Sequence, residues 1–414
     1  MAVLFVASWA CMGLMAYQDT RPVRGPLAAI TRPATKPAAT QPVQAGPQIT
    51  ISKDGPWGRM EVVPLVLELP DPYAVAEQAM RVHDRWTFAG QTQQTARSVL
   101  IACGLSSEQL SAMAGATWAS TATGVSVEPP DAVILSLTPA CRAALYGRLM
   151  SDPANKSSVD PMWFRDGRVD FRLRGSGLSE ASVALLKRLL YASPDEPSTL
   201  LFADLKPAIR AIDDPAERQR FLKAVTRKRS LVARLFVDSD TDTAALSRYW
   251  GRGGREDNLQ PLLDSLKFNA ISGVERPGKI NVVTLLPPFV QERLYRHAEA
   301  TTPAGRTPDD CFWTAFNFFS DSPDDRFHDA AYLMQALPRE YMPIDEPTQL
   351  GDVIILAAPN GEAIHAANYV ADDIVFTKNG MSRRQPWILV PMRDLLTQYR
   401  IKNPTMTIAC FRKR

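Results

Sequence analysis

The sequence is poor in residues that bind metals, and it lacks the short motifs that bind nucleotides. Its 414 residues include four His and five Cys, and no two Cys are spaced as Cys-x-x-Cys. This spacing does not fit a zinc finger or a disulfide framework. There is also no Gly-x-Gly-x-x-Gly, no phosphate-binding loop and no Gly-x-Ser-x-Gly. We therefore expect no cofactor and no metal ion.

No charge of one sign dominates either. The formal net charge is +3 and 45% of the residues are hydrophobic, which predicts globular domains and not a nucleic-acid scaffold. One stretch, from Arg248 to Arg255, interleaves Arg, aromatic and Gly residues. Such a stretch is typical of an anion site or of a helix that ends at Gly with a basic last turn. Because the total charge is small, we prefer the second interpretation and expect no nucleic-acid partner.

The N-terminus has an apolar run with no basic residue before it. The run from Met1 to Ala16 is too short to cross a bilayer comfortably and favours an export signal or membrane-anchor segment over residues 1–19. Residues 20–48 are rich in Pro, Ala and Thr and predict an extended linker, because they cannot bury enough surface to fold. We expect an exported bacterial protein, periplasmic or at the cell surface, that meets a membrane through its N-terminal segment alone.

Residues 49–300 carry the start signals of several helices. The segment from Ser106 to Gln109 has the pattern of a capping box, and Asp214 is followed by a Pro that suits the first turn of a helix. Extended pieces are expected near residues 49–69 and 231–237. The helical segments share no fixed period, which argues against a repeat solenoid. We predict an irregular, mainly helical domain whose role and partner the sequence does not reveal.

Two residues near the C-terminus have the setting of a reactive pair. Cys311 follows two Asp at the start of an apolar helix, and His365 lies on the second of two predicted strands. A helix dipole and a nearby imidazolium both favour a thiolate, which is the nucleophile of Cys enzymes. The preceding Asp residues oppose ionisation of the thiol. A Cys on an apolar helix is also commonly a plain core residue, and His328 is a reserve partner.

This C-terminal part, residues 301–414, resembles the NlpC-type group of papain-like cysteine peptidases and amidases. Asp310-Cys311, then Gly351-Asp352 before an apolar strand, then His365 match the family in order. The bulky Phe312-Trp313 depart from it, because small residues usually follow the Cys there. The resemblance implies an α+β fold, with the mainly helical domain followed by a small papain-like domain of one helix and an antiparallel sheet.

The resemblance also implies a third polar residue about a dozen positions after His365. Thr377, Lys378 and Asn379 all lie near that position. Asn379 is the best chemical candidate, because its amide oxygen can accept the N–H of an imidazole ring. Its place just before Gly380 equally suits a turn.

The resemblance implies a thiol hydrolase, either a peptidase or an amidase, or an acyl transferase. Its catalytic residues would be Cys311, His365 and Asn379, and its substrate a peptide such as a cell-wall peptide. The sequence leaves a second interpretation open. The chain would then be a surface-tethered helical scaffold or binding protein whose papain-like domain is catalytically inactive.

Overall fold

The computed structural model describes residues 49–75, 84–155, 161–164, 169–194, 196–274, 277–299, 307–403 and 405–414. The predicted export segment (1–19) and linker (20–48) lie outside these ranges. The chain divides into two compact units, which we call the insert, Val66–Lys228, and the main unit, formed by the residues before and after it. Helices and antiparallel sheets occur in both, so the fold is α+β. None of the described helices has the length and apolarity needed to cross a membrane.

This division differs from the expected boundary at residue 300. Strands from both sides of the insert are neighbours in one four-stranded sheet, in the order β1-β2-β9-β10. The N–H of Phe236 donates to the carbonyl oxygen of Arg59 (3.0 Å). Residues 229–299 therefore belong with the C-terminal region. The strands are β1 (Thr50–Ile51), β2 (Met60–Leu67), β9 (Lys228–Val237) and β10 (Gly278–Asn281).

The insert has two small sheets, ordered β3-β5-β4 and β6-β8-β7, and two hydrophobic clusters, of which one includes residues from both sheets. The predicted capping box is confirmed, with Ser106 as the N-cap of α4. The strands are β3 (Trp86–Ala89), β4 (Thr117–Thr121), β5 (Gly124–Glu128), β6 (Met162–Phe164), β7 (Tyr191–Ala192) and β8 (Leu200–Phe202). The helices are α3 (Gln93–Ala102), α4 (Ser107–Ala112), α5 (Asp131–Ser136), α6 (Pro139–Met150), α7 (Val169–Leu173), α8 (Glu180–Leu189), α9 (Leu205–Arg210) and α10 (Pro215–Thr226).

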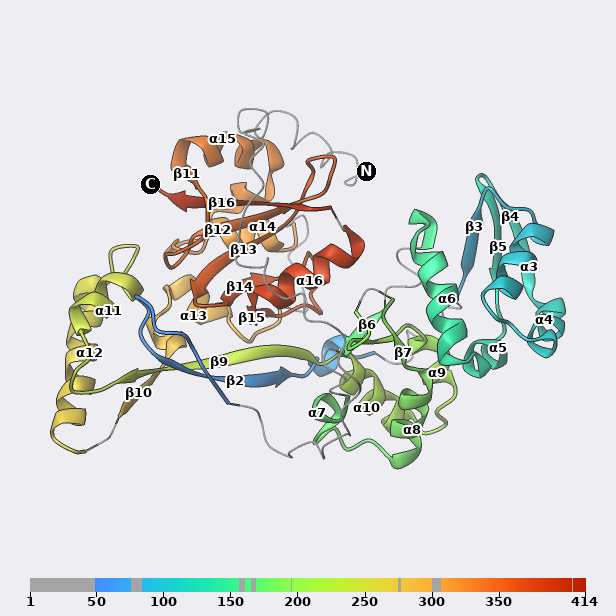
Figure 1. The fold of residues 1–414 in the computed structure, drawn as a ribbon, viewed down its shortest axis with the longest axis horizontal. Helices are drawn as coiled ribbons and strands as arrows, with labels where there is room; N and C mark the ends of the chain where they lie inside the picture. Colours follow the sequence, from blue (N-terminus) through green and yellow to red (C-terminus); the bar gives the residue numbers. More distant parts are fainter. Residues whose placement is uncertain are drawn as a thin grey trace, which may run out of the picture. The chain divides into compact units, whose positions relative to one another are not determined.

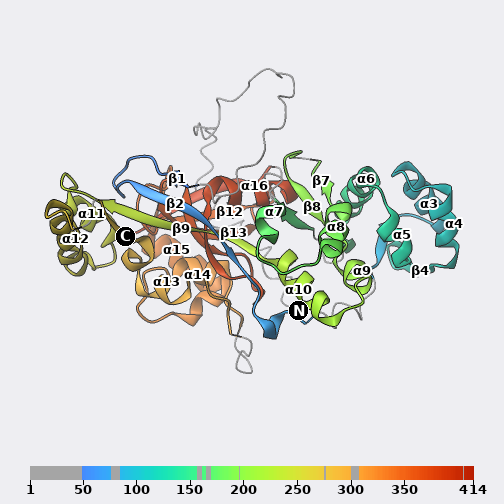
Figure 2. The ribbon, with the colours of Figure 1, turned by 90° about the horizontal axis from the view of Figure 1, so that it is seen from below.

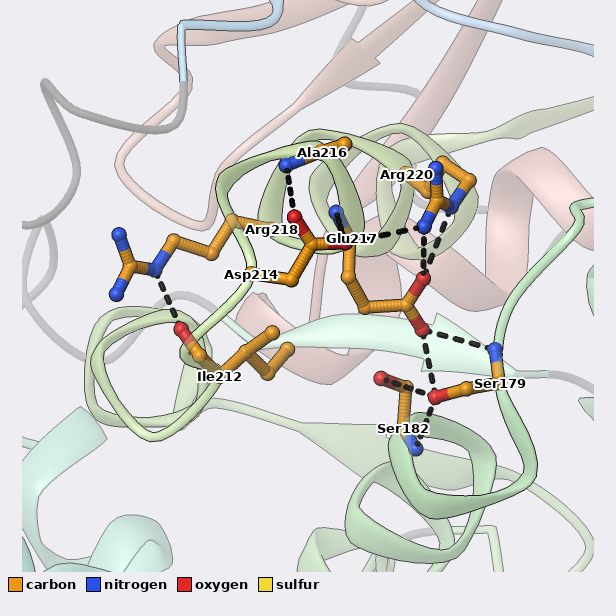
Figure 3. A network of polar contacts seen from close by, with 8 residues as sticks. All are labelled: Ser179, Ser182, Ile212, Asp214, Ala216, Glu217, Arg218 and Arg220. Atoms are coloured by element: carbon orange, nitrogen blue, oxygen red, sulfur yellow. Dashed lines mark hydrogen bonds and ion pairs between the residues drawn. The ribbon is translucent and has the colours of Figure 1, made fainter.

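A buried carboxylate ties α8 to α10 inside the insert (Figure 3). One oxygen of Glu217 accepts bonds from the backbone N–H and the hydroxyl of Ser179, both at 2.8 Å. The other oxygen pairs with Arg220 at 2.8 Å. Burial by itself would raise the pKa of Glu217, but hydrogen bonds from Ser182, Ser179 and Arg220 outweigh it and lower the pKa to about 2.

The main unit is built on a six-stranded antiparallel sheet in the order β11-β16-β12-β13-β14-β15 (Figure 1). Helices α11 and α12 lie side by side near the four-stranded sheet (Figures 1 and 2). The six strands are β11 (Tyr341–Ile344), β12 (Val353–Ala357), β13 (Ala363–Ala371), β14 (Ile374–Lys378), β15 (Trp387–Pro391) and β16 (Thr407–Lys413). The helices are α11 (Thr243–Trp250), α12 (Glu256–Ile271), α13 (Pro288–Arg293), α14 (Cys311–Phe316), α15 (Ala330–Glu340) and α16 (Met392–Lys402).

Side chains alternate across the six-stranded sheet, so its two faces pack against different helices. Ala366 and Val370 of β13 join the cluster that holds Trp313 and Phe316 of α14, and we call this the α14 face. Ala367, Tyr369 and Val375 join a separate cluster with Leu395 and Leu396 of α16, and we call this the α16 face. The strand β13 thus separates the helix that begins at Cys311 from the helix that follows β15.

The carboxylate of Glu217 gives the first prediction. Replacing it in Glu217→Gln removes the charge that three donors stabilise, and we expect the free energy of unfolding to fall by about 1–2 kcal/mol at pH 7. Because the folded-state pKa lies below the ordinary value of 4.5, this stabilisation is present above pH 4.5 and lost as the pH falls toward 2. Urea unfolding at pH 7 and pH 3 measures both effects.

The exposed carboxylate of Asp213 supplies the matched control for this experiment. The variant Asp213→Asn is expected to leave unfolding within about 0.5 kcal/mol of the natural protein. A Glu217→Gln variant that is equally destabilised at both pH values would show that packing, and not the charge, explains the loss.

Candidate active site

Cys311 is the first residue of α14 and lies against the six-stranded sheet. Asp310 is the N-cap of this helix and accepts the backbone N–H of Trp313 at 2.8 Å. Helix α14 contacts both β13 and β14. The indole N–H of Trp387 on β15 donates to the hydroxyl of Thr314 at 3.0 Å and fixes the helix to the sheet. The predicted place of Cys311 at a helix start is confirmed.

The environment of Cys311 does not favour a thiolate. The residue is 5% exposed. Burial raises the pKa of its thiol to about 12, and the charge of Asp310 adds to the increase. Backbone hydrogen bonds, from Ala366, Cys311 and Phe312, oppose the increase without cancelling it. The helix has only six residues, so its dipole is small. Cys311 is therefore a neutral thiol at pH 7.

His365 is fully buried on β13, and both of its ring nitrogens have partners. Nε2 lies 2.8 Å from the hydroxyl oxygen of Thr377 on β14, and Nδ1 lies 2.8 Å from the hydroxyl oxygen of Tyr399 on α16. The ring of Tyr399 also stacks on the imidazole, with centroids 4.5 Å apart and 22° between the planes. Burial lowers the pKa of His365 to about 3, so the imidazole is neutral at pH 7.

The donors and acceptors around His365 assign its tautomer. We assign the N–H to Nε2 of His365, because the hydroxyl of Thr377 then donates to the carbonyl oxygen of Ala366 at 3.3 Å while its oxygen accepts from Nε2 at 2.8 Å. Nδ1 is then the unprotonated nitrogen, and the hydroxyl of Tyr399 donates to it. The nitrogen that acts as a base in a neutral imidazole is consequently occupied by a phenol.

Cys311 and His365 both adjoin β13 but are not coupled to each other. His365 shares its hydrogen-bond partners with the α16 face, whereas α14 packs on the opposite face. No hydrogen bond joins Cys311 Sγ to His365 among the residues that the structure describes. Asn368, three residues after His365, points to the other side, where its side-chain amide donates to the carbonyl oxygen of Ala315 at 3.0 Å.

Asn379 does not bond to His365 in this structure. It follows the last residue of β14, and its side-chain oxygen is buried without a hydrogen-bond partner within the described part of the chain. Thr377, two residues earlier, makes the bond that was expected of Asn379. The neighbouring Lys378 is buried and donates to the carbonyl oxygen of Gly380 at 2.7 Å. Burial lowers the pKa of Lys378 to about 8.

His328, the reserve partner, lies beside the acidic start of α14. Its ring stacks on Trp313 with centroids 5.4 Å apart, and its Nε2 is 3.6 Å from a carboxylate oxygen of Asp309. It lies in a short 3-10 helix, Asp325–His328, and not on the sheet. Its position supports the helix start and gives no direct hydrogen bond to Cys311.

The Gly351-Asp352 pair organises the sheet. Gly351 has φ +84°, and a Cβ there would lie 2.2 Å from the ring of Phe319. Asp352 is fully buried, pairs with Arg412 of β16 at 2.7 and 2.8 Å, and accepts the N–H of Thr348 at 2.9 Å. These residues join the turn before β12 to the neighbouring strand.

Tyr399 is the residue that the sequence did not reveal. Its signal is weak, because a Tyr placed three and four residues after Leu396 and Leu395 is ordinary on a half-buried helix.

The described ranges hold no group of three or more His, Cys, Asp or Glu placed to bind a metal ion. Comparison with protein-family models, with curated proteins and with solved structures finds no match to this chain.

The buried Asp352 gives the second prediction. In Asp352→Asn, one oxygen of the carboxylate becomes an amide N–H₂ group, and Arg412 loses its charged partner. Breaking a buried ion pair from one side costs about 3–5 kcal/mol, so we expect a large decrease in the melting temperature measured by circular dichroism. The exposed Asp345, in the turn between β11 and β12, supplies the control Asp345→Asn. Equal melting temperatures for the two variants would contradict the structural role of Asp352.

Proposed function

We propose that the main unit is a thiol hydrolase or acyl transferase that uses Cys311 as nucleophile and His365 as base. Thr377 takes the place of Asn379 as the residue that orients the imidazole. The observation that carries the proposal is the 2.8 Å bond between Thr377 and His365 Nε2. Thr377 lies twelve residues after His365, where the NlpC-type resemblance calls for a third polar residue. Helix α14, which begins at Cys311, contacts the strand that holds His365.

The proposed reaction follows the chemistry of a Cys–His pair. The thiol of Cys311 gives its proton to His365 Nδ1 as sulfur attacks the carbonyl carbon of an amide. The imidazolium then returns the proton to the leaving amine, and the acyl group stays on sulfur as a thioester. Water, or a second amine, takes the acyl group and restores the thiol. This sequence requires Nδ1 to leave Tyr399 and face Cys311.

We also propose a location for this enzyme, the cell surface, and a substrate class, cell-wall peptides. An exported enzyme of this class would meet the peptides of a bacterial cell wall, whose amide bonds suit a thiol nucleophile. The apolar segment of residues 1–19 and the linker of residues 20–48 support export. Phe312, beside the nucleophile, favours a narrow binding cleft.

A binding or scaffold protein with an inactive papain-like domain is the second candidate, and specific observations favour it. Cys311 and His365 are both buried, and both nitrogens of the imidazole already have partners. The pKa of the thiol, raised to about 12 by burial, keeps it protonated. A unit that stays in this arrangement has no nucleophile at neutral pH.

Turnover by variants in which one Cys is replaced separates the two candidates and gives the third prediction. We expect the full chain to cleave or transfer amides in a panel of peptides and cell-wall fragments read by mass spectrometry. Cys311→Ala is expected to lower the rate by at least about a thousandfold, because it removes the nucleophile. Cys410→Ala, at a buried Cys on β16, is the matched control and retains activity.

Equal turnover by Cys311→Ala and the natural chain would end the enzyme proposal. So would an absence of any product across the panel from a folded natural chain, and the scaffold interpretation would then stand.

A further inference from the structure

We propose that Tyr399 is a latch that holds this site in a latent state by occupying Nδ1 of His365. The inference rests on the proposed function and concerns its regulation. Release of the phenol frees Nδ1, and the imidazole can then turn toward Cys311 and take the proton of its thiol. Tyr399 is therefore a positioning residue that acts through His365 and does not itself react.

The contact between Tyr399 and His365 has two components. The hydroxyl lies 2.8 Å from Nδ1, which is the geometry of a hydrogen bond. The ring lies over the imidazole at a centroid distance of 4.5 Å. The hydroxyl blocks the lone pair, and the ring holds the imidazole in its present orientation. A proton from a thiol cannot reach Nδ1 while both components remain.

The opposite nitrogen makes the latch specific to one tautomer. In the tautomer assigned above, Thr377 donates to Ala366 and accepts from Nε2 of His365. Nε2 thus keeps its proton whether or not Tyr399 is in place. Loss of the Tyr399 bond leaves an imidazole with one free lone pair, at Nδ1, which is the state that a general base requires.

The anchoring of α16 lets Tyr399 move without unfolding the sheet. At the start of the helix, the N–H of Met392 donates to the carbonyl oxygen of Asp373 at 2.6 Å, and the N–H of Arg393 donates to the Asp373 carboxylate at 3.2 Å. Leu395 and Leu396 are buried in the cluster of the α16 face. Tyr399 lies about one turn beyond them, so its side chain can turn away from Nδ1 while α16 stays in place, and His365 must then turn toward Cys311.

The neighbourhood of Cys311 is consistent with this arrangement. Burial raises the pKa of Tyr399 above its ordinary value, and a negative charge on Cys311 raises it further. The phenol therefore stays a hydrogen-bond donor over the whole range in which the enzyme would work. Asp310 and Lys378 are the charged groups that act on the thiol, and neither bonds to Tyr399.

The test, and the fourth prediction, is the rate of alkylation at Cys311. The full chain and the variants Tyr399→Phe, His365→Ala and their double mutant are treated with iodoacetamide, and the peptide that carries Cys311 is followed by mass spectrometry. The hydrogen bond is worth about 0.5–1.5 kcal/mol, so we expect Tyr399→Phe to react about fivefold faster at pH 7.5. The alkylation rate of Tyr399→Phe is also expected to rise at a pH closer to neutral than that of the natural chain.

The expected increase in the alkylation rate depends on His365, so the double mutant should not show it. Tyr249→Phe is the matched control, because it removes another buried phenol of the main unit, bonded to the carbonyl oxygen of Val370 at 2.7 Å. Its alkylation rate is expected to match that of the natural chain. Tyr399→Leu, which also lacks the hydroxyl, replaces Tyr399→Phe if that variant fails to fold.

Failure of the latch and failure of the enzyme proposal give different results. Suppose that Tyr399→Phe does not raise the alkylation rate, while His365→Ala is alkylated more slowly than the natural chain. The latch is then wrong and the Cys–His pair stands. If the double mutant keeps the gain, Tyr399 only shields Cys311 from the reagent, and the latch is wrong. If neither variant changes the rate, both proposals fail.

Discussion

The alternation of side chains along β13 from His365 to Tyr369 is the constraint on which the rest of the site depends. Residues an odd number of positions apart project to opposite faces of a strand, so Asn368 bonds to α14 whereas His365 bonds to Tyr399 and Thr377. The hydrophobic clusters on each face make a shift of register costly. The imidazole of His365 therefore lies on the α16 face, and it can reach the thiol of Cys311 only if its side chain moves.

Desolvation dominates the electrostatics of this region. It raises the pKa of Cys311, lowers that of His365 and lowers that of Lys378, so each group is pushed toward its neutral form. A Cys enzyme needs the opposite result at its nucleophile. In this arrangement both groups are buried and neutral, so the same two residues are compatible with a latent enzyme and with a scaffold.

The sequence was informative where local rules apply. The helix that begins at Cys311 and the strand that holds His365 follow from hydrophobic patterning. The choice of Asn379 over Thr377 misjudged where the strand ends, since Thr377 lies on β14 and Asn379 follows its last residue. Tyr399 and the insert could not be predicted, because both depend on contacts between segments far apart in the sequence.

The position of the insert has a consequence for how the chain reaches its fold. The N–H of Phe236, near the end of β9, donates to the carbonyl oxygen of Arg59, which directly precedes β2. The end of β2 therefore adjoins the start of β9, and the insert begins and ends at neighbouring points. Closing a flexible loop costs about 0.6 kcal/mol for each doubling of its length. An insert that folds first removes most of that cost, because its own structure already holds its two ends together. During synthesis from the N-terminus, the order of the chain favours this sequence of events.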